Sequence, residues 1–193
     1  MKMDENVKKL MTSDSPEVIT SLDLEFNQPS GKIIQIGAVI GNCKTGEVLC
    51  DMELYVDPYE RLSDRIITLT GITEEDIRQK GMSLMQAYSI LAENHVKHNS
   101  FINPLTWGGG DSAELRKQIG NPEKWPFGRR WVDVKTVFQF YCWANNLKSR
   151  AGLAKAMRKL GMDFSGKKHN GRDDAYNTFR VYCHLLDKLK NPK

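Results

Sequence analysis

Residues 18–26 read Val-Ile-Thr-Ser-Leu-Asp-Leu-Glu-Phe, and this short stretch decides the fold. The stretch is rich in β-forming residues and is followed at 27–31 (NQPSG) by turn-forming residues, so we predict a strand that ends there. Asp23 and Glu25 stand at positions i and i+2 of this strand. Side chains at that spacing project from the same face, with Cα atoms roughly 6–7 Å apart. The stretch therefore predicts two carboxylates side by side on a mostly apolar strand.

Two further strands follow directly. Residues 32–39 (KIIQIGAV) and 47–56 (EVLCDMELYV) are also rich in β-forming residues, with a turn at 42–46 between them, so the three strands should form an antiparallel meander. Beyond Pro58 the apolar residues recur at helical spacing. Short strands are expected at 100–107 and 130–134, and helices from Thr73, at 82–95, 111–119, 136–144, 153–160 and 171–190. This order predicts an α/β fold with a mixed sheet of about five strands, flanked by helices.

Apolar stripes are expected on two of these helices. On the helix at 82–95 the predicted buried stripe consists of Met85, Ala87, Ile90 and Leu91. On the last helix it consists of Phe179, Tyr182, Leu186 and Leu189. The other histidines of the chain, His95, His98 and His184, are expected on helix surfaces or helix ends, and they are assigned no role.

The length and composition are those of one globular domain. The chain has 193 residues, with 40% hydrophobic and 27% charged residues, which excludes wholesale disorder and collagen-like or coiled-coil architectures. We expect an arm or short helix at 1–16 and a single domain at 17–193. No apolar stretch approaches the roughly 20 residues that span a bilayer, and 1–10 (MKMDENVKKL) are charged where a signal peptide would be apolar. The expectation is a cytoplasmic protein without a membrane anchor.

The four cysteines indicate neither a metal knuckle nor a disulfide framework. They are scattered without a C-x-x-C pair, and each lies in an apolar run. We therefore expect small buried side chains at Cys43, Cys50, Cys142 and Cys183.

Charge is divided unequally along the chain. Residues 124–193 contain 16 Lys and Arg against 5 Asp and Glu, whereas residues 1–123 contain 12 against 19. An acidic body with a basic C-terminal third suggests a polyanionic partner that also meets a cluster of carboxylates. The alternative is that these Lys and Arg side chains are simply solvated on helix surfaces.

Three acidic motifs carry candidate chemistry. Asp23 and Glu25 would repel each other unless a divalent cation such as Mg²⁺ or Mn²⁺ neutralised them, although hydration at a strand edge is the alternative. In the motif at 168–175 (KHNGRDDA), His169 precedes Asp174 by five residues at the start of the last helix, and a histidine beside a metal-bound carboxylate can take a proton from water. In the motif at 106–111 (TWGGGD), Asp111 follows three glycines and could equally cap the next helix.

Taken together and in order, these motifs resemble the DEDD superfamily of 3′→5′ exonucleases, and His169 is similar to the histidine of its DEDDh branch. The resemblance extends over residues 18–186. It is closest to the RNA-trimming exonucleases that process histone messenger RNA and small interfering RNA ends. In that branch the second acid likewise follows Thr-Trp-Gly, and the last motif resembles residues 166–175 (GKKHNGRDDA).

The resemblance implies an RNase H-like fold and a phosphodiester hydrolysis with two Mg²⁺ or Mn²⁺ ions per site. Asp23 matches the ligand that bridges both ions, Glu25 and Asp174 complete the site of one ion, and Asp111 matches the fourth acid. His169 matches the general base. Asp173 is left out because it lacks the five-residue spacing from the histidine. The implied substrate is single-stranded nucleic acid with a free 3′ end, with RNA as first choice and DNA as second, and the implied products are 5′-mononucleotides.

Substrate contacts are also implied by the resemblance. Leu24 and Phe26 would flank the carboxylates. The segment Thr70, Gly71 and Ile72 would border the terminal base, and Trp107 could offer a stacking face. Core packing is an equal alternative for Phe26 and Trp107. Phe26 stands where many relatives have Thr, and the triple glycine departs from the usual spacing. Basic residues expected to track phosphates are Lys148, Arg150, Lys155, Arg158, Lys167, Lys168 and Arg172. The rival interpretation is a non-catalytic nucleic-acid-binding or adaptor module on the same fold.

Overall fold

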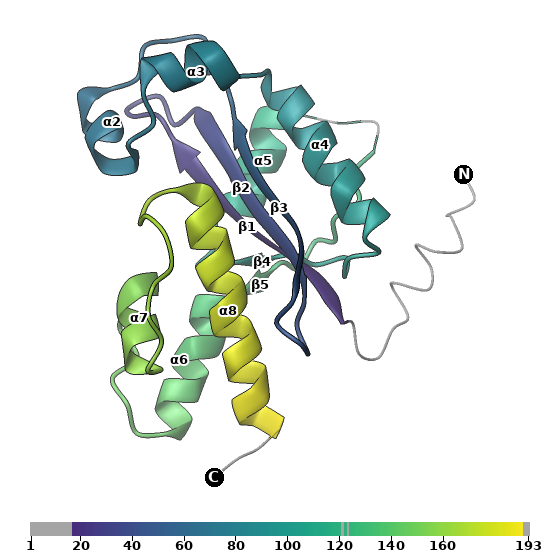
Figure 1. Ribbon diagram of the computed structural model, residues 1–193, viewed down its shortest axis with the longest axis vertical. Coiled ribbons are helices and arrows are strands. Elements are labelled where there is room, and N and C mark those ends of the chain that lie inside the picture. The colour runs from purple at the N-terminus through teal and green to yellow at the C-terminus, as the bar shows by residue number, and fades with distance from the viewer. Residues whose placement is uncertain (1–16, 121, 123, 191–193) are drawn as a thin grey trace.

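The structure is a computed structural model that describes residues 17–120, 122 and 124–190, so the arm predicted at 1–16 lies outside the described residues. The strands are β1 (Val18–Phe26), β2 (Ile33–Asn42), β3 (Val48–Tyr55), β4 (Leu105–Thr106) and β5 (Val132–Asp133). The helices are α2 (Asp64–Thr70), α3 (Glu74–Lys80), α4 (Leu84–Lys97), α5 (Asp111–Ile119), α6 (Val134–Ala144), α7 (Leu153–Lys159) and α8 (Gly171–Lys190). Figure 1 shows α8 alongside the long strands, with α6 and α7 at its flank.

The five strands form one mixed sheet in the order β3-β2-β1-β4-β5. The first three strands pair antiparallel, whereas β4 pairs parallel with β1 and β5 parallel with β4. This arrangement confirms the predicted α/β class and the predicted meander. In the register of β1 and β2, Asp23 lies opposite Gly37 and Glu25 opposite Gln35, which brings the two acids to the centre of the sheet.

The side chains of β1 alternate between two cores. Ile19 belongs to a cluster with Phe138 of α6 and Phe179 of α8, on one face of the sheet. Leu22 and Leu24 belong to a second cluster on the other face, with α4. Because residues i and i+2 of a strand share a face, Asp23 and Glu25 project to the α8 side. A mostly apolar strand thus presents its acids toward the helix that carries Asp174.

Helix α8 begins in direct contact with the sheet. A Cβ atom on Gly37 would overlap the backbone of Gly171 and Arg172, and a Cβ on Gly171 would lie 3.3 Å from the carbonyl oxygen of Asp23. Only glycine at position 37 permits this approach, whereas a side chain at position 171 would make tight contacts. Gly41 similarly leaves room for the ring of Phe179, where a Cβ would come within 2.5 Å of the ring. The sequence of β2 therefore determines where α8 starts relative to β1.

The structure corrects several sequence predictions. The helix α2 was not predicted, and the strands expected at 100–107 and 130–134 are reduced to β4 and β5, of two residues each. Met85 and Leu189, predicted to be buried, are 46% and 66% exposed. His95, predicted on a surface, is 2% exposed, and its Nδ1 lies 2.8 Å from the hydroxyl of Thr20.

The cysteine prediction holds in part. None of the four cysteines, all within the described residues, forms a disulfide. Cys43 and Cys142 are buried, whereas Cys50 and Cys183 are only half-buried. Among the helices of the described residues, none has both the length and the apolar character needed to cross a bilayer.

Candidate active site

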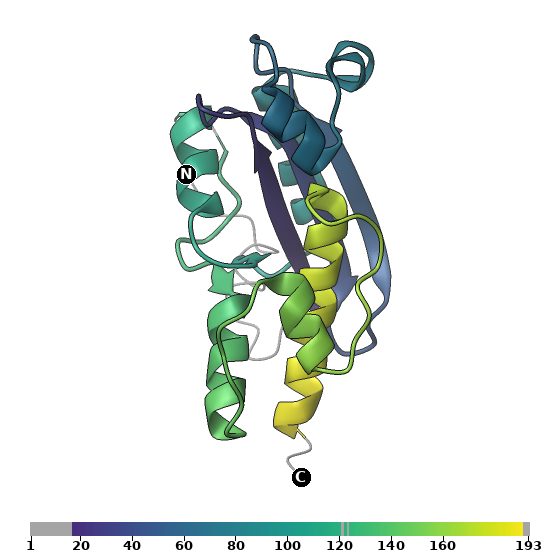
Figure 2. The ribbon, with the colours of Figure 1, turned by 90° about the vertical axis from the view of Figure 1, so that its left-hand side faces the viewer.

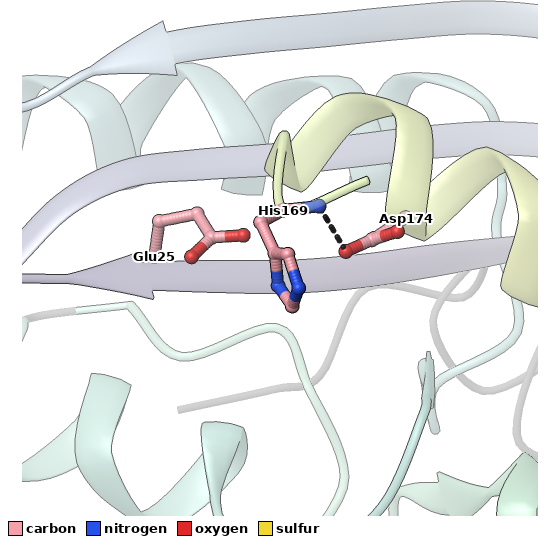
Figure 3. Close-up of side chains that lie close together, drawn as sticks. All are labelled: Glu25, His169 and Asp174. Atoms are coloured by element: carbon pink, nitrogen blue, oxygen red, sulfur yellow. Dashed lines mark hydrogen bonds between the residues drawn. The ribbon is translucent and has the colours of Figure 1, made fainter. Parts of the chain in front are cut away.

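Three of the five predicted catalytic residues meet where β1 ends and α8 begins. Glu25, His169 and Asp174 each offer one oxygen or ring nitrogen atom, and these atoms all lie within 4.8 Å of one another. Figure 3 shows the imidazole of His169 between the two carboxylates. Strand β1 and the distant segment formed by α8 and the loop before it thus present a set of oxygen and nitrogen donors to one point.

The loop before α8 is held by hydrogen bonds to its two aspartates. The backbone N–H of His169 donates to Oδ2 of Asp174 at 3.0 Å, and His169 takes the left-handed conformation with φ of 60° (Figure 3). The backbone N–H of Lys167 donates to Oδ2 of Asp173 at 2.7 Å, while Arg172 pairs with Oδ1 of the same carboxylate. Asp173 therefore shapes the loop, and its side chain is committed to these contacts.

A buried glutamine, which the sequence analysis did not single out, anchors the start of α8. Gln35 is fully buried, and its Oε1 accepts a hydrogen bond of 2.7 Å from the backbone N–H of Gly171. Its Nε2 donates to Glu53, which also accepts from the side-chain amide of Asn170. A free N–H at a helix start needs such an acceptor. The available signal was a lone polar residue inside the apolar run 32–39.

The carboxylates are electrostatically coupled. Burial raises the pKa of Asp23 well above its usual range, and the charges of Glu25, Asp111 and Asp174 raise it further. Burial, with Asp174 and Asp111, raises the pKa of Glu25 to about 8. Burial also raises the pKa of Asp174, against the hydrogen bond from His169. Within the described part of the chain, none of these four acids takes part in an ion pair.

The fourth acid, Asp111, lies at the first residue of α5. The N-cap is Gly110, without a side-chain hydrogen bond, so the alternative that Asp111 caps this helix is wrong. Burial raises the pKa of Asp111 to about 6, helped by the charge of Asp133. Figure 2 shows β1 running between α5 and α8.

Asp133 is a second residue that the sequence analysis missed. It is the N-cap of α6, and its Oδ1 also accepts a hydrogen bond of 3.0 Å from the backbone N–H of Gly108. This bond fixes the glycine loop that leads to Asp111. The signal was an aspartate directly before a helical run, which is a capping position.

The predicted substrate contacts occupy different environments. The side chains of Leu24, Thr70 and Ile72 are buried, so only their backbone atoms could meet a ligand. Phe26 lies on the opposite face from the acids and lines a groove of about 680 Å³ that contains none of the five predicted catalytic residues. Trp107 is half-buried against Phe138.

The ammonium group of Lys167 lies directly against Gly71. A Cβ atom at Gly71 would overlap Nζ of this lysine. The loop after α2 and the loop before α8 therefore meet here. Arg172, predicted to contact phosphates, pairs with Asp51 at 2.5 Å and with Asp173 at 2.8 Å. The remaining predicted phosphate contacts are exposed.

Comparison with known proteins places this geometry in a family. The profile of the exonuclease family (RNase T) matches residues 19–182. The human protein "ERI1 exoribonuclease 2" is 27% identical over 175 residues, which cover 77% of this chain and 24% of that protein. The chain thus spans about a quarter of the length of that relative.

Solved structures share the fold. The nuclease domain of 3′hExo, described as a DEDDh family member bound to rAMP, superposes with a TM-score of 0.76 at 23% identity, covering 91% of this chain and 94% of that one. Pop2p of S. pombe, in its Mg²⁺- and Mn²⁺-bound form, superposes with a TM-score of 0.69 at 16% identity, covering 98% and 90%. These matches confirm the predicted RNase H-like fold. The chain belongs to the exonuclease family.

Proposed function

We propose that this chain is a metal-dependent 3′→5′ exonuclease that removes 5′-mononucleotides from single-stranded nucleic acid. The observation that carries the proposal is the convergence of Glu25, His169 and Asp174 within 4.8 Å, at the end of the strand that also presents the buried Asp23. A structural role does not account for such a set, because burying like charges together costs free energy unless a cation compensates them.

The donor set fits divalent ions of the Mg²⁺ and Mn²⁺ type. These ions favour carboxylate oxygens, and the four acids have no Lys or Arg partner among the described ion pairs. We assign Asp23 as the residue shared by two ions, Glu25 and Asp174 as ligands of one of them, and Asp111 as the fourth acid. When bound, such a pair of ions stabilises the charge on the attacking and leaving oxygens of a phosphodiester.

His169 is the proposed general base. Its backbone is fixed by Asp174, while its ring is exposed beside the carboxylate of Glu25, where a water molecule and a phosphodiester could both reach it. An imidazole in this position can hold the proton that the attacking water loses.

RNA is the proposed first substrate and DNA the second. The name of the human relative and the rAMP in the 3′hExo structure support RNA. The terminal nucleotide would lie near the glycine backbone at Gly71, with Leu24, Thr70 and Ile72 shaping the pocket through backbone atoms, and with Phe26 and Trp107 as secondary candidates for contact.

The test is digestion of 3′-labelled RNA and DNA strands of matched sequence, with and without EDTA. Asp23→Asn is the informative variant because it keeps the shape of the side chain and removes its charge. Asp64→Asn is the matched control, since the side chain of Asp64 is 93% exposed on α2. We expect EDTA and Asp23→Asn to abolish release of mononucleotides, and Asp64→Asn to leave it unchanged.

Two outcomes contradict the proposal. Hydrolysis that survives both EDTA and Asp23→Asn would exclude a metal mechanism at this site. Binding of the strand without any cleavage, with Mg²⁺ or Mn²⁺ present, would favour the non-catalytic binding module.

A further inference from the structure

The outer face of α6 carries an unusual pair of exposed aromatic side chains. Phe140 is 58% and Trp143 60% exposed, and their ring centroids lie 5.4 Å apart in an edge-to-face arrangement. The inner face of the same helix is filled by Phe138 and Cys142, which are fully buried. The exposed pair therefore contributes nothing to the core that α6 already completes, and it leaves a large apolar surface open to solvent.

The loop after α6 holds cationic side chains next to this pair. The indole Nε1–H of Trp143 donates to the hydroxyl of Ser149 at 3.1 Å, so Lys148 and Arg150 flank the residue that contacts the ring. The ammonium group of Lys159, in α7, donates to the backbone carbonyl of Lys148. These contacts tie the aromatic pair, the loop and α7 into one surface.

This surface is strongly basic, and Asp133 and Asp163 lie at the two ends of the segment that forms it. Residues 134–162 contain no Asp or Glu. None of the cations of this segment forms an ion pair within the described residues. They are Lys135, Lys148, Arg150, Lys155, Arg158 and Lys159. A run of unpaired cations favours a polyanion, and exposed aromatic rings beside it are the stacking platforms that single-stranded nucleic acid binds.

The surface also lies within reach of the candidate active site. Lys135, in the first turn of α6, packs near Gly108 of the glycine loop that leads to Asp111. From Lys135 to Trp143 the helix rises about 12 Å, which matches about four stacked nucleotides at 3.4 Å each. Figure 2 shows α6 and α7 below α5 and below the start of α8.

We propose that the outer face of α6, with the 145–150 loop and α7, binds the single strand upstream of its 3′ end. This inference rests on the proposed exonuclease function. Phe140 and Trp143 stack on bases, and the cations of the segment contact phosphates. Because every base has an aromatic face, the surface strengthens binding without reading sequence. The enzyme should therefore hold strands of more than about four nucleotides better than shorter ones.

The experiment compares hydrolysis of a trinucleotide and of a 12-nucleotide RNA by wild type and by the double variant Phe140→Ala/Trp143→Ala. Stacking contributes about 1–3 kcal/mol per base, so we expect the KM for the 12-mer to rise about tenfold or more, with kcat unchanged. Hydrolysis of the trinucleotide should be unaffected. Val96→Ala, at an apolar side chain 48% exposed on α4, is the matched control and should leave both substrates unaffected.

A binding measurement in EDTA separates this inference from the proposed function. Fluorescence anisotropy of a labelled 12-mer should show weaker binding by the double variant even if the wild type hydrolyses nothing. The variant Trp143→Phe keeps an aromatic ring at this position and should therefore bind the 12-mer more tightly than the double variant does. A merely structural role of Trp143 would not require this result. Lys148→Ala/Arg150→Ala should lower the slope of log K against log salt by about 0.7 for each lost phosphate contact.

Equal affinity of wild type and double variant for the 12-mer would overturn the inference. The aromatic pair would then be better explained as a surface for an acidic protein partner.

Discussion

The backbone N–H of Gly171 donates to the side-chain oxygen of Gln35 at 2.7 Å, across 136 positions of sequence. This bond joins the first residue of α8 to the third residue of β2, opposite Glu25. It sets the position of the helix that carries Asp174 and of the loop that carries His169. The arrangement of the acidic site thus depends on a residue that need not touch metal or substrate.

Replacing Gln35 by leucine should weaken both the fold and the site. The variant leaves the N–H of Gly171 without an acceptor, which costs about 1–3 kcal/mol. We expect the free energy of unfolding to fall by that amount in urea titrations, together with a weaker affinity for Mn²⁺. Gln118→Leu is the control, because Gln118 makes equivalent hydrogen bonds to the backbone of Gly31 and Ile33, away from α8. Gln118→Leu should lose stability and keep its affinity for Mn²⁺. Equal Mn²⁺ affinity in the two variants would therefore contradict a positioning role for Gln35.

Replacing His169 by alanine should slow hydrolysis by about 10²–10⁴-fold, because it removes the proposed proton acceptor. Mn²⁺ affinity, measured by calorimetry, should be largely kept, since no carboxylate is lost. His98→Ala, at the end of α4, serves as the control with normal turnover. Unchanged turnover in His169→Ala would show that the base is another group.

The carboxylate cluster should make the metal-free protein less stable as the pH rises. The pKa of Glu25 is raised to about 8 and that of Asp111 to about 6, so the folded state holds protons that the unfolded state has released. Their protonated forms therefore favour folding at acidic pH, and this contribution is lost as the pH rises through 6 and 8. Melting curves at pH 5.5 and 8.0 should show that Mn²⁺ raises Tm more at the higher pH.

Glu25→Gln isolates this effect. The variant carries no charge at position 25 at any pH, so its stability in EDTA should depend less on pH than that of the wild type. If the two proteins lose stability in parallel between pH 5.5 and 8.0, the cluster does not repel in the folded state.

His95 should make the fold sensitive to acid. Burial lowers the pKa of His95 from 6.5 to about 4. Between these pH values the unfolded chain binds a proton at this residue and the folded chain does not. Stability conferred by the neutral ring is complete above pH 6.5 and is lost as the pH falls toward 4. Between pH 7 and pH 5 this contribution should fall by about 2 kcal/mol, measured in urea titrations as the difference between the wild type and His95→Gln. His98→Gln should keep the pH dependence of the wild type, and an unaltered pH dependence in His95→Gln would contradict this account.

The acidic motifs could be predicted from the sequence because the spacing of the residues within each motif determines which side chains lie together. Asp23 and Glu25 stand at the strand period, and His169 and Asp174 flank a helix start that is marked by glycine. Their convergence, however, depends on contacts across the sheet, such as the approach of Gly171 to Gly37. That approach is visible only once β1 and β2 are in register.

The failures also have physical causes. The helix α2 (Asp64–Thr70) contains several β-branched residues with low helix propensity, and its ends are set by the Ser63 cap and by Gly71 in the left-handed conformation. His95 has the polarity of a surface residue, yet it is buried in α4 with a hydrogen bond to Thr20 of β1. A buried polar pair of this kind leaves no periodic signal.

The close approach of α8 to β2 has a consequence for how the protein is made. Asp174 belongs to the last helix, whereas Asp23 belongs to the first strand. During translation, Asp23, Glu25 and Asp111 leave the ribosome before the segment that carries Asp174. The proposed active site should therefore be complete only once α8 has been translated and has docked against Gly37.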